Sequence, residues 1–145
     1  LVAASLFVTE TRQSTETVYG DPGGDIFQFM AKYNEMADKG TNLRIDGVCA
    51  SACTFFLNIL PNDKVCATDR ADFGFHGVYT GFGGFNQPFT QWTQDIVYPQ
   101  YVRDLLKNVY GFDGTKDVDT TRWPTGVIWI NGTDIQTQLH IQHCD

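Results

Sequence analysis

Three short segments of the chain combine residue types that could carry out acyl transfer. Residues 20–24 (GDPGG) form a glycine-rich turn before a predicted helix, where backbone N–H groups can bind a developing oxyanion. Residues 49–53 (CASAC) place Ser51 between two alanines at the start of another predicted helix, whose dipole favours negative charge. Residues 73–77 (FGFHG) contain His76, the residue type that most often acts as a general base, followed by a glycine-rich stretch that leaves it accessible. Each segment alone is weak evidence, and it is their order on one chain that makes the combination informative.

The hydrophobic pattern predicts the elements that must position these segments. A strand that ends at 17–19 leads into the glycine turn, and an amphipathic helix follows from Asp25 to a stop at Gly40. A strand at 43–48 leads into the apolar helix that begins with CASAC and ends before Pro61. Further strands are predicted at 64–68, 71–77 and 127–130, and further helices at 91–110, with a kink or break at Pro99, and at 133–141. This order is typical of an α/β layered domain, and 145 residues suit a single domain over 1–145.

Taken together, the segments resemble the ClpP/crotonase superfamily. GDPGG resembles the SPGG turn of ClpP peptidases, and RIDGVCASACTFFL resembles the strand and helix that carry the nucleophilic serine. KVCATDRADFGFHG resembles the stretch that carries the catalytic histidine, and WINGTDIQTQLHI is weakly similar to the last strand and helix. CASAC followed by GFH is most similar to the exported bacterial ClpP-like proteins. The resemblance covers about residues 15–80 well and implies a single-domain α/β fold, a ClpP/crotonase-like spiral of ββα units.

The resemblance also implies the role of each site residue. Ser51 would attack a carbonyl carbon, and His76 would take its proton and pass it to the leaving group. The backbone N–H groups of Gly23 and Ala52 would form the oxyanion hole. The predicted activity is therefore that of a ClpP-like serine peptidase or related hydrolase, which needs no cofactor and no metal.

The third member of the triad is harder to place. In ClpP an Asp precedes the aromatic residue of the last strand, and alignment on Trp129 puts Val127 near that position, where it cannot orient an imidazole. We expect Asp119 to be the acid, although the acids of this loop could equally be surface residues without a catalytic role. The alternatives left open are Asp117, Asp113, Thr125 and a backbone carbonyl.

Four cysteines have to be assigned. A bridge between Cys49 and Cys53 is expected to distort the start of the helix, so these two are predicted to be buried free thiols. A bridge between Cys49 and Cys66 is possible if the protein is exported. A cysteine nucleophile at the helix start is a minor alternative.

The loop at 77–90 is rich in glycine and aromatic residues, and loops of this length are often functional. Its aromatic side chains are expected either to line an apolar substrate pocket or oligomer contact, as part of a lid, or to pack into the core. The residues concerned are Phe82, Phe85, Phe89 and Trp92.

The two ends of the chain allow simple expectations. The apolar segment 1–8 is predicted to be a strand, with the tail of a processed signal segment as the alternative. At the other end His140 and His143 lie near Cys144, and a frayed tail is expected there in preference to a weak metal site.

Composition limits the partners. With 10 basic and 17 acidic residues the net charge is −7, which argues against nucleic acid and anionic membranes as main partners. No apolar stretch approaches the ~20 residues that a membrane span needs. The expected partners are a peptide or protein substrate and further copies of the chain, in the periplasm or outside the cell. The competing hypotheses are an inactive ClpP-like module that serves in assembly or protein interaction and, less favoured, an acyl-CoA enzyme of the crotonase type.

Overall fold

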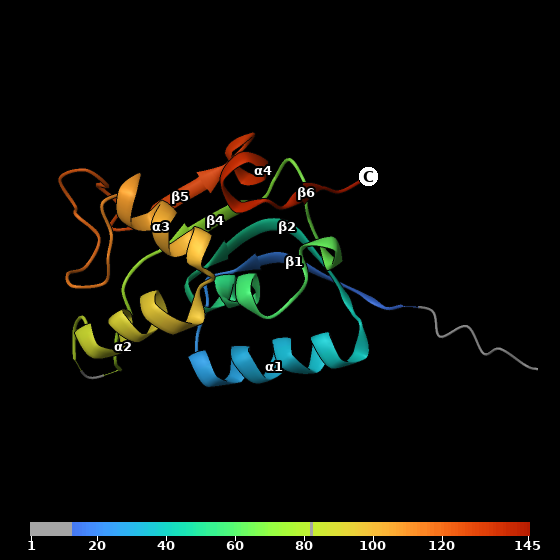
Figure 1. Ribbon diagram of the computed structural model, residues 1–145, viewed down its shortest axis with the longest axis horizontal. Helices are drawn as coiled ribbons and strands as arrows, with labels where there is room; N and C mark the ends of the chain where they lie inside the picture. Colours follow the sequence, from blue (N-terminus) through green and yellow to red (C-terminus); the bar gives the residue numbers. More distant parts are fainter. Residues whose placement is uncertain (1–12, 82) are drawn as a thin grey trace, which may run out of the picture.

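The computed structural model describes residues 13–81 and 83–145, which form a mixed α/β fold around a curled sheet (Figure 1). The segment 1–8 and Phe82 lie outside the described residues. The strands of the sheet are β1 (Thr15–Asp21), β2 (Asn42–Ala50), β3 (Val65–Ala67), β4 (Asp72–Phe75), β5 (Ile128–Asn131) and β6 (Gln142–His143). All pairings are parallel except that of β4 with β5.

The long strand β2 organises the sheet. β1 pairs along one side of β2, so β3 and β4 share the other side, with β3 beside residues 43–45 and β4 beside residues 48–50. β6 then extends the sheet from β3, and β5 extends it from β4. The two ends of β2 therefore face two different regions of the molecule.

The helices follow from local signals in the sequence. α1 (Ile26–Lys39) begins after Asp25, whose carboxylate accepts the N–H groups of Phe27 and Gln28, and it ends at Gly40 in a left-handed conformation. The predicted start and stop of this helix are confirmed. The remaining helices are η1 (Ser51–Asn58), η2 (Asn62–Lys64), α2 (Gln87–Trp92), η3 (Thr93–Val97), α3 (Gln100–Asn108) and α4 (Asp134–Leu139).

The helices after β2 and around Pro99 refine the predictions. η1 is a 3₁₀ helix rather than the expected α-helix. It lies between the sheet and α1 and is buried from Ala52 to Leu57 (Figure 1). Pro99 divides the predicted long helix, as expected, and its first part already begins at Gln87.

Buried aromatic residues form much of the core between η1, α1 and the sheet. Tyr33, Phe56, Phe73 and Phe75 are almost completely buried, and Tyr33 packs edge-on against Phe56. The hydroxyl of Tyr33 donates to the carbonyl of Cys53 over 2.7 Å, which satisfies both buried polar groups. This contact fixes η1 on α1. Among the described residues no helix is long and apolar enough to cross a membrane.

The cysteine predictions are wrong. All four cysteines are bridged, in the pairs Cys49–Cys53 and Cys66–Cys144, so there is neither a free thiol nor a Cys49–Cys66 bridge. The chain reverses direction between β2 and η1, which brings the Cα atoms of Cys49 and Cys53 to 5.3 Å, a normal separation for a disulfide. A thiolate nucleophile is excluded in this structure.

The C-terminal end is also more ordered than a frayed tail. β6 pairs with β3, and the N–H of Cys144 donates to the carbonyl of Ala67. Together with the disulfide to Cys66, these bonds attach the last residues to the sheet.

Candidate functional site

The carboxyl ends of β2 and β4 bring the two main candidate residues to one edge of the sheet. Ala50 of β2 pairs with Gly74 of β4 in parallel register. Ser51 is therefore one residue beyond a matched pair, and His76 is two residues beyond it, on neighbouring strands. Functional residues of α/β sheets commonly lie at such carboxyl ends.

Ser51 has an unusual backbone conformation. Its φ is +55°, in the left-handed region that serine rarely occupies, whereas the preceding Ala50 is extended. This turn reverses the chain from β2 into η1 and places the half-buried Ser51 at the first position of the helix. Residues held in left-handed backbone conformations are concentrated at active sites.

Gly23 packs directly against this turn. A Cβ atom at position 23 would lie 2.8 Å from Cβ of Ser51 and 3.0 Å from the backbone nitrogen of Ala52, so only glycine fits. Gly23 also has a φ of +92°, which an L side chain would strain. The structure thus brings Gly23, Ser51 and Ala52 together. Ala52 is the second residue of η1, where backbone N–H groups have no carbonyl partner within the helix.

The N–H of Gly23 is not free. It donates to Oδ1 of Asp21 over 2.9 Å, in a turn that the GDPGG segment closes on itself. A substrate oxygen could take this N–H only after the Asp21 carboxylate moves aside. This contact is not among the predictions from the sequence, although an Asp two residues before a Gly is a recognisable signal for it.

His76 is oriented by a backbone carbonyl. Its Nδ1 lies 2.6 Å from the carbonyl oxygen of Gly77, which only accepts hydrogen bonds, so Nδ1 carries the proton and the neutral ring has its lone pair on Nε2. The ring also packs against Tyr79, with 6.1 Å between the ring centroids. Within the described residues no hydrogen bond joins Ser51 to His76. Of the alternatives for the third partner, a backbone carbonyl is the one that contacts the imidazole.

The expected acid, Asp119, is not joined to His76. Its carboxylate accepts the N–H and the hydroxyl of Thr121 on the surface, and these bonds lower the pKa of Asp119. Asp113 makes the same kind of turn with Thr115. Both carboxylates thus stabilise local turns of the loop between α3 and β5. The hydroxyl of Thr125 donates to the carbonyl of Val127 in the same loop.

Asp117, two residues earlier, contacts the histidine segment instead. One carboxylate oxygen accepts the N–H of Gly77 over 3.2 Å, and the other accepts the hydroxyl of Tyr79. Gly77 is the next residue of the chain after His76, and the Tyr79 ring packs against the His76 ring. The hydrogen bond to the Asp117 carboxylate, together with burial, raises the pKa of Tyr79 to about 12. Asp117 therefore supports the position of His76 without touching it.

An apolar surface lies beside the site, between α1 and α2. Phe27, Phe89 and Trp92 contact one another, with ring centroids 6.3–6.4 Å apart, and with Pro88 they line a hollow of about 300 Å³. Phe27 and Phe89 are 60% and 39% exposed, so this surface is open to a ligand. We call it the aromatic surface.

Both parts of the candidate site are attached to the aromatic surface. Phe27 follows the Gly23 turn by four residues, and the N–H of Val78, two residues after His76, donates to the hydroxyl of Thr90 in α2. Phe85, which was expected near this surface, instead pairs with Tyr79 in a short bridge of the loop after His76.

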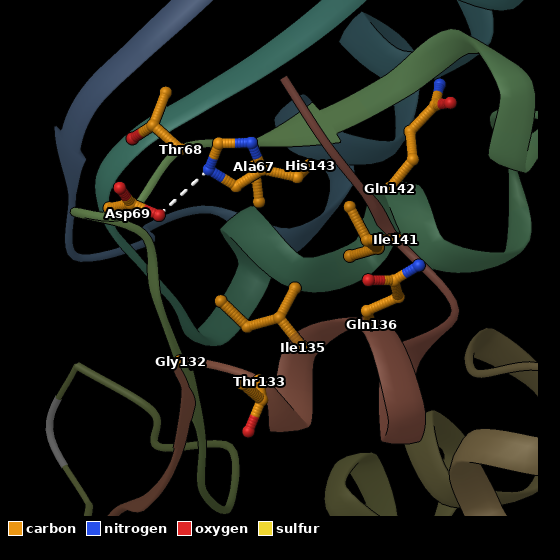
Figure 2. Close-up of a pocket in the computed structure, with 10 residues that line it drawn as sticks. All are labelled: Ala67, Thr68, Asp69, Gly132, Thr133, Ile135, Gln136, Ile141, Gln142 and His143. Atoms are coloured by element: carbon orange, nitrogen blue, oxygen red, sulfur yellow. Dashed lines mark hydrogen bonds and ion pairs between the residues drawn. The ribbon is translucent and has the colours of Figure 1, made fainter. Parts of the chain in front are cut away.

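A second region, at the other end of β2, also contains a histidine and a carboxylate. Nε2 of His143 lies 2.8 Å from Oδ1 of Asp69, beside a cavity of about 340 Å³ (Figure 2). The backbone N–H of Thr68, in the wall of this cavity, donates to the carbonyl of Ile45 in β2. Ile45 precedes Ser51 by six residues, which corresponds to roughly 20 Å along an extended strand. This cavity is therefore separate from the candidate site.

Among the described residues no group of three or more His, Cys, Asp or Glu side chains is placed to hold a metal ion. Comparison of the chain with models of protein families and with curated proteins finds no match.

Proposed function

We propose that this protein is a serine hydrolase of the ClpP/crotonase type, with Ser51 as the nucleophile and His76 as the general base. The observation that carries the proposal is the left-handed turn at Ser51, packed against Gly23 at the start of a helix. This conformation costs about 1–2 kcal/mol, and backbone strain of this kind is concentrated at active sites.

The proposed reaction uses the geometry as follows. Ser51 Oγ attacks the carbonyl carbon of the substrate while Nε2 of His76 takes the hydroxyl proton, and His76 then gives this proton to the leaving group. The Gly77 carbonyl accepts a hydrogen bond from the Nδ1 proton of His76, so Nε2 lies on the opposite side of the ring from this hydrogen bond. The Ala52 N–H stabilises the oxyanion, and the Gly23 N–H joins it when the Asp21 carboxylate is displaced. Water then attacks the carbonyl carbon of the acyl-serine ester while His76 takes its proton. His76 returns this proton to Ser51 Oγ, and the acyl group leaves as a carboxylic acid.

The substrate is proposed to be a peptide or another acyl compound with an apolar group next to the scissile bond. The aromatic surface supports this, since it is attached to both the Gly23 turn and the segment after His76. Two disulfides in a chain of this length support an oxidising compartment, the periplasm or the cell exterior. The partly exposed aromatic surface is equally compatible with the homo-oligomer that we expect.

A second candidate function is that of an inactive module of the same fold. Two observations favour it: the described residues contain no Ser51–His76 hydrogen bond, and Asp21 occupies the Gly23 N–H. Catalytic hydrogen bonds often tighten only when substrate binds, so these contacts are compatible with an active enzyme.

A fluorophosphonate probe, which labels activated serines covalently, distinguishes the serine hydrolase from the inactive module. The purified protein should be labelled at one site, Ser51→Ala should lose the label, and the matched control Ser14→Ala should keep it. The adduct is located by peptide mass spectrometry. Absence of labelling of folded protein between about pH 6 and pH 9, around the ordinary pKa of histidine, would favour the inactive module.

A further inference from the structure

The Cys49–Cys53 disulfide closes a five-residue ring with Ser51 at its centre. Cys49 is the penultimate residue of β2, and Cys53 is the third residue of η1. Both side chains are completely buried, with no exposed surface. The bridge is therefore built into the interior wall behind the candidate nucleophile.

This ring constrains the left-handed turn. In a continuing strand, Cα atoms four residues apart would be roughly 13 Å apart, whereas those of Cys49 and Cys53 are 5.3 Å apart. The bridge can close only if the chain reverses between them, and the residue at which it reverses is Ser51, with a φ of +55°. Since the left-handed conformation is unfavourable for serine, closure of the ring opposes relaxation of the turn.

The same turn is held from the other side by a buried hydroxyl pair. Thr54 donates to the carbonyl of Ser51 over 2.7 Å, and its oxygen lies 2.7 Å from the hydroxyl of Tyr98. Because Thr54 has already given its only proton, Tyr98 is the donor in the second bond. Burial raises the pKa of Tyr98 well above its usual range, which keeps this donor protonated.

We infer that the Cys49–Cys53 disulfide is a positioning element of the active site. It holds Ser51 in the left-handed turn and thereby fixes Ser51 Oγ and the Ala52 N–H relative to Gly23. The Thr54–Tyr98 pair contributes to the same constraint. This inference rests on the proposed hydrolase function, and it gives the disulfide a catalytic purpose beyond stability.

The test compares two disulfide-deleted variants, Cys49→Ala/Cys53→Ala and the matched control Cys66→Ala/Cys144→Ala. For each folded variant the maximal rate of fluorophosphonate labelling and the probe concentration at half-maximal rate are measured. The first variant should lose about 100-fold in maximal rate, the scale of a misplaced reacting group, with little change in half-saturation. The control should keep its maximal rate. The pH midpoint of labelling should be unchanged in both, because His76 is untouched.

The outcomes separate the inference from the proposed function. If the unaltered protein is not labelled, the hydrolase proposal fails, and the inference fails with it. If the unaltered protein is labelled and the Cys49→Ala/Cys53→Ala variant reacts at the same maximal rate, only the inference is wrong. An equal loss of rate in both disulfide variants would also overturn it, since the effect would then be general.

A second pair of variants applies if the Cys49→Ala/Cys53→Ala protein does not fold. Thr54→Val removes the hydroxyl that holds the Ser51 carbonyl and keeps the side-chain shape, whereas Thr54→Ser keeps the hydroxyl. Labelling should slow in Thr54→Val and be restored in Thr54→Ser. Equal rates in these two variants would overturn the inference.

Discussion

The two ends of strand β2 carry similar residues but differ in what they can do. At one end Nε2 of His143 lies 2.8 Å from the carboxylate of Asp69 beside a cavity, and Cys66–Cys144 joins residues 78 positions apart. At the other end the His76 ring has a hydrogen bond to a backbone carbonyl and none to a carboxylate among the described residues, and Cys49–Cys53 joins residues four positions apart. By histidine–carboxylate geometry alone, the first end would be the better candidate.

The two ends also differ in their hydroxyl groups. Near His143, the Thr68 hydroxyl is already bonded to the carboxylate of Asp46 over 2.6 Å. Near His76, by contrast, Ser51 stands in a left-handed turn against a glycine that no other residue can replace. The left-handed turn and the closely packed glycine are therefore the features that favour Ser51 as the proposed nucleophile.

The largest expected effect is on the labelling rate when each of the two histidines is replaced by alanine in turn. His76→Ala should slow fluorophosphonate labelling by at least about 100-fold, the usual contribution of a general base. His143→Ala should leave the rate unchanged, since the Thr68 hydroxyl near it is already bonded to Asp46. Both variants are compared by gel fluorescence at equal protein and probe concentrations. A large loss of labelling in His143→Ala would reverse the assignment of the two ends.

Removal of Cys49–Cys53 is expected to have the larger effect on the labelling rate, whereas removal of Cys66–Cys144 should have the larger effect on stability. Bridging residues 78 positions apart restricts the unfolded chain more than bridging residues four apart. Loss of Cys66–Cys144 should lower the free energy of unfolding by about 4 kcal/mol, and loss of Cys49–Cys53 by about 2 kcal/mol. Urea denaturation of the two double alanine variants measures both values. A larger loss from the short bridge would indicate that it mainly stabilises the fold.

Much of the fold could be predicted because its signals are local. The start of α1 at Asp25, its stop at Gly40 and the break at Pro99 each depend on the capping or ring chemistry of a few neighbouring residues. The positions of Ser51 and His76 at one sheet edge could be predicted from strand order and from the resemblance to a known family.

The errors concern contacts that depend on three-dimensional structure. A regular helix start is not expected to accommodate a Cys49–Cys53 bridge, whereas the left-handed turn at Ser51 does accommodate it. Serine carries no sequence signal for such a turn. Asp117 and Asp119 are two residues apart in a loop without periodicity, so only the path of that loop decides which of them reaches the histidine segment.

Asp117 and Asp119 provide the smallest and most specific test. Asp117→Asn should slow labelling by about tenfold, because the Gly77 N–H and the Tyr79 hydroxyl lose a charged acceptor and the His76 segment is held less firmly. Asp119→Asn, the matched control, should leave the rate unchanged. The Asp117 carboxylate favours the neutral phenol that donates to it, so Asp117→Asn should also lower the pKa of Tyr79 from about 12 toward 10. Ultraviolet titration of tyrosine ionisation measures this shift separately from catalysis. If the pKa of Tyr79 falls and labelling does not, Asp117 holds the tyrosine alone, and the Gly77 carbonyl suffices to orient His76.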